Sequence, residues 1–247
     1  MPLILFGVVL LLYVLLFILM KLYETGEVEP DPTNTLILEA SALGRSLLFT
    51  APSESNLTIL LMVACAIFVS SEFKSGMTKI RLSRGANKVG LYFSKFIMLS
   101  GVTVVYTIGT FILSAILSLC FFNLNGFTAL EFGYLIRSIV LSIYINLSII
   151  SIYMMLAYLV RNMGGTIGAC IGTYVVGSLF STVAALFQEG TPVAEIFNCV
   201  PSRLLTFAGF AGEYDLAKTL ELIFVPLFFI VVCNIVSIFT FKNRDVK

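Results

Sequence analysis

Long apolar segments are the feature that most constrains this chain, because each is about as long as a helix must be to cross a bilayer. Hydrophobic residues make up 59% of the 247 residues and charged residues only 12%, and the mean hydropathy is +1.03. A soluble domain has about a quarter charged residues. The sequence therefore predicts an all-α integral membrane protein.

Six segments qualify as membrane spans by length and composition. They cover residues 3–22, 57–73, 96–122, 137–160, 164–187 and 219–241. The first segment could also be a signal peptide, but no basic residue precedes it and no small-residue cleavage site follows it, so we expect a retained span. Residues 90–95, just before the third span, could form an interfacial helix that leads into the membrane.

The distribution of charge predicts the orientation of these spans. Loop 71–95 contains one acidic residue, Glu72, and six basic residues: Lys74, Lys79, Arg81, Arg84, Lys88 and Lys95. Basic loops stay on the cytoplasmic side of a membrane. Six spans then put both termini in the cytoplasm, and the inner side holds ten of the fifteen basic residues but two of the fourteen acidic ones. We expect a single six-span domain, residues 1–247, with this topology.

Two outer connectors are too long to be simple turns. Residues 23–56 begin with an acidic, proline-marked stretch and continue into a partly apolar segment, which predicts a short helix on the outer surface. Residues 188–218 mix apolar side chains with glycines and prolines, which is typical of a segment that dips into a protein-lined part of the membrane and returns. An ordinary surface loop is the alternative.

Two patterns with four-residue spacing mark faces of predicted spans. The first consists of Gly164, Gly168 and Gly172, and the second of Ser138, Ser142 and Asn146. A glycine face lets a second helix approach closely, and the partner helix could belong to this chain or to a second subunit. The polar face is explained either by hydrogen bonds between helices or by a wetted pathway.

The sequence lacks the residues and motifs that several kinds of functional site require. There is no histidine, no close cysteine pair and no GxxxxGK[ST] loop, so we expect no catalytic, metal or cofactor site and no enzymatic activity. No predicted span has a charged residue near its midpoint, which disfavours an ion-driven carrier. Nothing in the sequence suggests a nucleic-acid partner. If transport is energised, the energy must enter through another polypeptide.

The loop after the second span has a residue pattern that also occurs in a known protein family. It comprises Glu72, Gly76, Thr78, Lys79, Arg81, Arg84 and Lys88. A glutamate leaving the span, a glycine four residues on, a threonine and an apolar, basic stretch resemble the corresponding loop in permeases of type-2 ABC exporters. Six spans in 247 residues and a broken last outer connector are also similar to that family.

This resemblance implies that loop 71–95 forms a short coupling helix that lies in a cleft of a cytoplasmic ATP-binding cassette subunit. That subunit would hold ATP and magnesium, and a second permease chain would complete the transporter. Permeases of this kind are linked to antimicrobial-peptide or lantibiotic export and immunity, so we expect a bacterial cell membrane and a hydrophobic or amphipathic peptide substrate. Alternatively, the basic residues only set orientation and bind anionic membrane lipid.

One departure from the family pattern lies at the amino terminus. The family usually begins with a basic amphipathic helix before the first span, whereas here an apolar run starts at residue 3.

A function of another class could also use loop 71–95. In that alternative, the chain is a non-transporting membrane sensor or scaffold that recruits a cytoplasmic partner.

Overall fold

The computed structural model describes residues 48–49, 55–121, 129–186, 198–209 and 214–243. Within these ranges the chain is helical and contains no strand, which confirms the predicted all-α class for this part of the protein. The helices are α3 (Ser55–Lys74), α4 (Met77–Ser83), α5 (Lys88–Phe121), α6 (Ala129–Val160), α7 (Met163–Leu186), α9 (Pro201–Ala208) and α10 (Leu216–Asn243).

Four helical segments in the described part are long and apolar enough to cross a membrane. They are Lys88–Cys120, Glu131–Val160, Met163–Val183 and Leu216–Asn243, and they correspond to the third to sixth predicted spans. Helix α3 covers the second predicted span. The first predicted span, residues 3–22, and nearly all of connector 23–56 lie outside the described residues.

Helix α5 is longer than the predicted third span. It runs without a break from Lys88 to Phe121, so residues 90–95 belong to the same helix and do not form a separate interfacial one. The sequence contains no proline or glycine pair there that would interrupt the helix. The chain therefore enters the bundle directly from the turn that follows α4.

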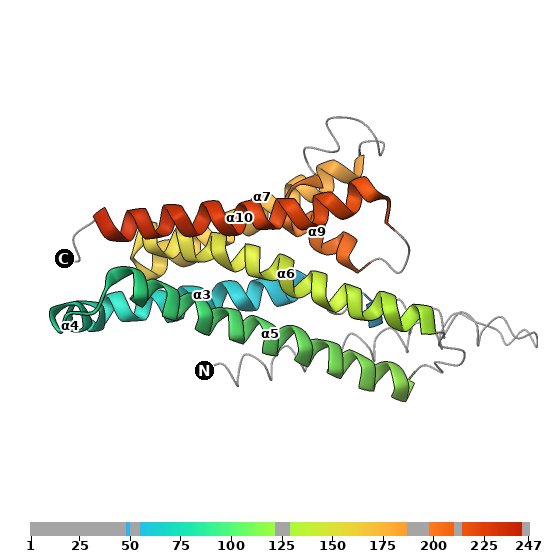
Figure 1. The fold of residues 1–247 in the computed structure, drawn as a ribbon, viewed down its shortest axis with the longest axis horizontal. Coiled ribbons are helices and arrows are strands. Elements are labelled where there is room, and N and C mark those ends of the chain that lie inside the picture. Colours follow the sequence, from blue (N-terminus) through green and yellow to red (C-terminus); the bar gives the residue numbers. More distant parts are fainter. Residues whose placement is uncertain (1–47, 50–54, 122–128, 187–197, 210–213, 244–247) are drawn as a thin grey trace, which may run out of the picture.

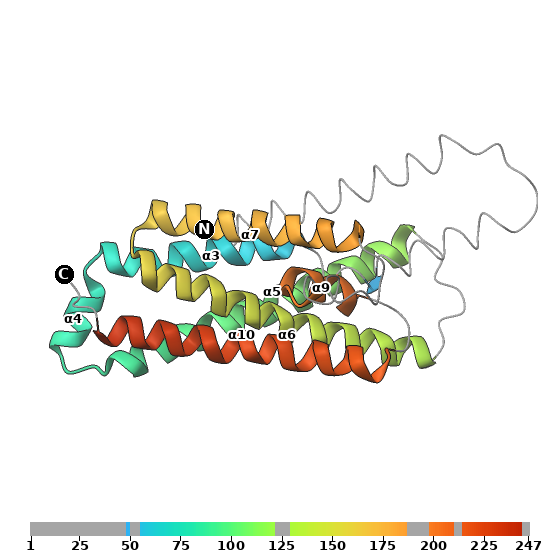
Figure 2. The same ribbon diagram turned by 90° about the horizontal axis from the view of Figure 1, so that it is seen from above.

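The long helices lie side by side and form an elongated bundle around α6 (Figures 1 and 2). Helix α6 contacts every other long helix and α9, and its side chains dominate the core. Large apolar side chains are exposed on the outer faces of α5 and α10, including Val105, Leu119, Phe228 and Phe239. Helices that are hydrophobic on all sides belong in a large core or in lipid.

The short helix α9 packs within the bundle. Pro201 stands at its start, and Leu204, Leu205 and Ala208 are buried against neighbouring helices. The Ser202 hydroxyl donates a hydrogen bond of 3.2 Å to the carbonyl of Gly177 in α7. Because Gly177 precedes the end of α7 by nine residues, about 13 Å along the helix, α9 lies beside α7. Much of connector 188–218 lies outside the described residues, and its dip into the membrane stays a prediction.

Candidate partner-docking site

Helix α4 lies at one end of the bundle, here called the α4 end, between the end of α3 and the start of α5 (Figures 1 and 2). Gly76 separates α3 from α4 and has a φ of +68°, a left-handed conformation that glycine adopts without strain. After α4, the Asn87 side chain accepts a hydrogen bond of 3.1 Å from the backbone N–H of Val89. This bond caps the start of α5.

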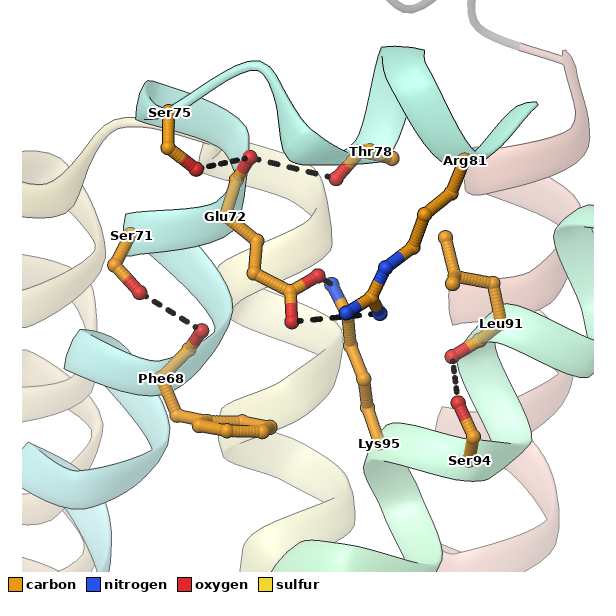
Figure 3. A network of polar contacts seen from close by, with 9 residues as sticks. All are labelled: Phe68, Ser71, Glu72, Ser75, Thr78, Arg81, Leu91, Ser94 and Lys95. Carbon is orange, nitrogen blue, oxygen red and sulfur yellow. Dashed lines mark hydrogen bonds and ion pairs between the residues drawn. The ribbon is translucent and has the colours of Figure 1, made fainter. Parts of the chain in front are cut away.

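An ion pair fixes this turn to the bundle. The Glu72 carboxylate lies 2.9 Å from the Lys95 ammonium group, and the Lys95 side chain is only 2% exposed (Figure 3). The Arg81 guanidinium lies 3.8 Å from the other Glu72 oxygen. Lys95 also lies over the rings of Phe73 and Tyr158, at 5.3 and 5.7 Å. The one acidic residue of the loop is therefore held within the chain and links α3, α4 and α5.

An aromatic cluster from four helices lies beside this ion pair. Its members are Phe73, Tyr92, Tyr158 and Phe241. The Tyr158 ring contacts the other three edge-on, with centroids 5.5 Å from Phe73, 5.1 Å from Tyr92 and 5.1 Å from Phe241. Such pairs add about 0.5–1.5 kcal/mol each beyond the burial of their area. The α4 ends of α3, α5, α6 and α10 are thus packed together.

A polar bridge connects α5, α6 and α10 farther from the α4 end of the bundle. The Tyr92 hydroxyl lies 2.6 Å from Asn234 Oδ1, and Asn234 Nδ2 lies 3.4 Å from the Ser151 hydroxyl. Neither this bridge nor the aromatic cluster is among the features predicted from the sequence. A signal was present, because all four aromatic residues stand at or near the ends of predicted spans.

Helix α4 has one buried and one exposed face. Thr78 is fully buried, and its hydroxyl lies 3.5 Å from the carbonyl oxygen of Glu72. Met77, Ile80, Arg81 and Arg84 follow the i, i+3, i+4, i+7 spacing of one helix face, which we name the α4 outer face. Met77 and Ile80 are 49% and 50% exposed, and the Arg84 side chain is exposed without an ion pair in the described residues.

The structure brings most of the predicted docking residues together. Glu72, Gly76 and Thr78 build the turn, while Arg81 and Arg84 lie on the α4 outer face. Lys88 instead donates a hydrogen bond of 3.1 Å to the carbonyl of Lys242 in α10. The side chain of Lys79 lies outside the described part of the structure. Their contact with a partner stays a prediction.

The two periodic patterns of the sequence have different surroundings. Gly164, Gly168 and Gly172 are exposed on α7, and a Cβ added at any of them would meet no atom within 4 Å in the described structure. The described helices therefore leave this face open. On α6, Ser138 donates a hydrogen bond of 3.2 Å to the carbonyl of Phe49, whereas the buried side chains of Ser142 and Asn146 make no hydrogen bond in the described residues.

The left-handed backbone at Gly76 leads to a stability prediction. Gly76→Ala should lower the free energy of unfolding by about 1 kcal/mol, because an L-residue is strained at this φ. No atom lies within 4 Å of the added Cβ, so the effect is purely one of backbone strain. Gly90→Ala is the matched control, since Gly90 has equal space and an ordinary helical backbone. Titrating both variants with denaturant in detergent micelles checks this, and equal effects would contradict it.

Comparison with known families places most of the chain in one group. A family model matches residues 23–247. The chain belongs to this family, described as "Protein of unknown function (DUF2705)". A search of curated proteins finds no match to this DUF2705 member. In the part of the chain that the structure describes, no three potential metal ligands come together.

Proposed function

We propose that this DUF2705 protein is the membrane-spanning permease subunit of an ATP-driven ABC exporter. A separate cytoplasmic subunit hydrolyses ATP and docks on the α4 outer face. The observation that carries the proposal is a short helix at the end of an apolar bundle, with two apolar and two cationic side chains exposed on one face. Six spans with both termini in the cytoplasm belong to this proposal.

The composition of the α4 outer face fits a protein partner. Arginine guanidinium groups can pair bidentately with carboxylates, and exposed methionine and isoleucine side chains gain free energy when a partner covers them. Orientation by positive charge needs only the basic residues. It does not require a left-handed glycine, a buried threonine and a bound glutamate that together hold α4 in place.

The same contacts provide a route for coupling. Helix α4 is joined to α3 and α5 by the Glu72–Lys95 ion pair, and the aromatic cluster joins these helices to α6 and α10. A displacement of α4 by a partner would therefore carry the α4 ends of four helices with it. The partner would change conformation when it binds and hydrolyses ATP. Because its conformations would bind two states of the bundle with different affinities, each ATP cycle would shift the bundle from one state to the other.

The remaining parts of the transporter follow from the resemblance. A second permease chain, identical or similar, completes the pair. The substrate is a hydrophobic or amphipathic compound, most simply a peptide, that leaves the bacterial cytoplasmic membrane. The chain itself contributes no catalytic group, and ATP and magnesium bind to the partner.

Affinity purification of the full chain in mild detergent tests the proposal. We expect an ATP-binding cassette protein to copurify with it, because the α4 outer face contacts that subunit directly. Mass spectrometry of the copurified proteins identifies the partner. Recovery of a kinase or regulator in its place would favour a membrane sensor or scaffold that uses the same helix. Recovery of the chain alone, after crosslinking in intact cells, would refute docking.

A further inference from the structure

A cavity of about 650 Å³ opens between the end of α3 and the start of α7, at the α4 end of the bundle. Four polar residues line it: Ser70, Lys74, Arg161 and Asn162. Met163 and Ile167 of α7 add apolar wall. The Ser70 hydroxyl donates a hydrogen bond of 3.3 Å to Thr166, which closes the contact between the two helices.

The polar lining is positively charged. Lys74 and Arg161 both line the cavity, and no carboxylate does so among the described residues. Glu72, the nearest acid in sequence, is already bound to Lys95. Lys74 is exposed and forms no ion pair in the described ranges. The cavity therefore has the charge that complements an anion.

The position of Arg161 adds to this argument. Its φ of +57° is uncommon for a residue with a side chain, and a glycine would adopt it with less strain. Its guanidinium lies 5.7 Å from the centroid of the Phe73 ring, and its Nε donates a hydrogen bond of 3.4 Å to the carbonyl of Tyr158. These contacts hold the charged group beside the cavity.

An apolar surface continues from the cavity along α7. Ile171 and Val175 are each 46% exposed, and the space above Gly164, Gly168 and Gly172 is open in the described structure. This surface belongs to a helix that is long and apolar enough to span the membrane. The basic residues of the cavity, next to the exposed apolar strip of α7, match the chemistry of a lipid with an anionic headgroup. Basic pockets between membrane-spanning helices are known to bind such headgroups.

We propose that this cavity binds one anionic phospholipid of the membrane leaflet at the α4 end. Its phosphate lies between Lys74 and Arg161, and an acyl chain extends along the exposed strip of α7. The site needs no ATP-binding partner, so it stands or falls separately from the docking function.

Lipid-dependent stability of the purified full chain tests the site. Phosphatidylglycerol added to the protein in neutral detergent should raise the melting temperature, whereas phosphatidylcholine should not, because its headgroup is neutral overall. Lys74→Gln and Arg161→Gln should each weaken the apparent affinity for phosphatidylglycerol about tenfold, since each removes a hydrogen bond to a charged group. Lys242→Gln, which removes an exposed base outside the cavity, should leave that affinity unchanged.

Three outcomes would overturn the proposal. Equal stabilisation by both lipids would show that the headgroup charge is not recognised. An equal shift with millimolar inorganic phosphate would identify a site for free phosphate and not for a lipid. Unaltered phosphatidylglycerol affinity in Lys74→Gln would place the lipid elsewhere. This variant remains decisive if Arg161→Gln does not fold, because the Lys74 side chain is exposed at the end of its helix.

Discussion

Replacing Lys95 by methionine is expected to lower the free energy of unfolding by about 3 kcal/mol, because it leaves the Glu72 carboxylate charged without its close partner. The side chains of Lys95 and Glu72 are 2% and 17% exposed, so water can solvate the remaining charge only in part. Arg81, at 3.8 Å and 46% exposed, compensates weakly, since ion pairs in contact with water contribute little.

A double-mutant cycle separates the ion pair from simple packing. Glu72→Gln combined with Lys95→Met should recover most of the lost stability, because no buried charge is then left alone. Reversible unfolding in mixed micelles measures Glu72→Gln, Lys95→Met and the double variant. Lys242→Met serves as the control and should change the free energy of unfolding by less than about 0.5 kcal/mol, since its side chain is exposed. Equal losses in the single and double variants would show that the lysine stem, packed on Phe73 and Tyr158, matters more than its charge.

Charge reversal on the α4 outer face should abolish coupling to the proposed ATP-binding partner. Arg81→Glu with Arg84→Glu replaces two attractive groups by two repulsive ones. We expect affinity for the partner to fall at least about 100-fold, because losing one partner of an interfacial charge pair already costs about 2–5 kcal/mol. ATP hydrolysis that depends on the permease should be lost with it. Membrane insertion should persist, since neither arginine lies in the four candidate spans.

The control for this variant also replaces a base by an acid on the same end of the protein. Lys242→Glu alters an exposed base that lies outside both the α4 outer face and the cavity lined by Lys74 and Arg161. Coupled hydrolysis should survive this substitution. Retained coupling in the arginine variant, or equal loss in both variants, would refute recruitment through α4. Arg84→Glu alone avoids placing a second carboxylate near Glu72 and should reproduce the effect at reduced size.

The long helices were predictable from length and composition, but two boundaries were not. Helix α6 begins at Ala129, whereas the predicted span begins at residue 137. Helix α7 begins at Met163 and α10 spans Leu216–Asn243, each within a few residues of the predicted span. Helix α5 begins at Lys88 and not at residue 96, because charged residues near its start favoured a loop in the sequence. Lys95 is nevertheless helical and buried, since Glu72 neutralises it. Hydropathy considers each residue alone and cannot detect such pairing.

The candidate site was predictable in its local part only. The resemblance of loop 71–95 to the permease family implied a short helix, and α4 is present there. The role of Glu72 as an internal anchor depends on Lys95, and the aromatic cluster depends on four helices meeting at one level. A single sequence gives no register between helices, because the spacing within each helix says nothing about its neighbour.

The aromatic cluster also divides the bundle mechanically. Tyr158 holds α3, α5, α6 and α10 through ring contacts, whereas the described side-chain hydrogen bond between α7 and α3 joins two small hydroxyl groups, Ser70 and Thr166. Four helices are thus held to one another near the α4 end. Helix α7 lies outside this set of ring contacts, so a movement of its α4 end relative to those four helices would leave the rings in place.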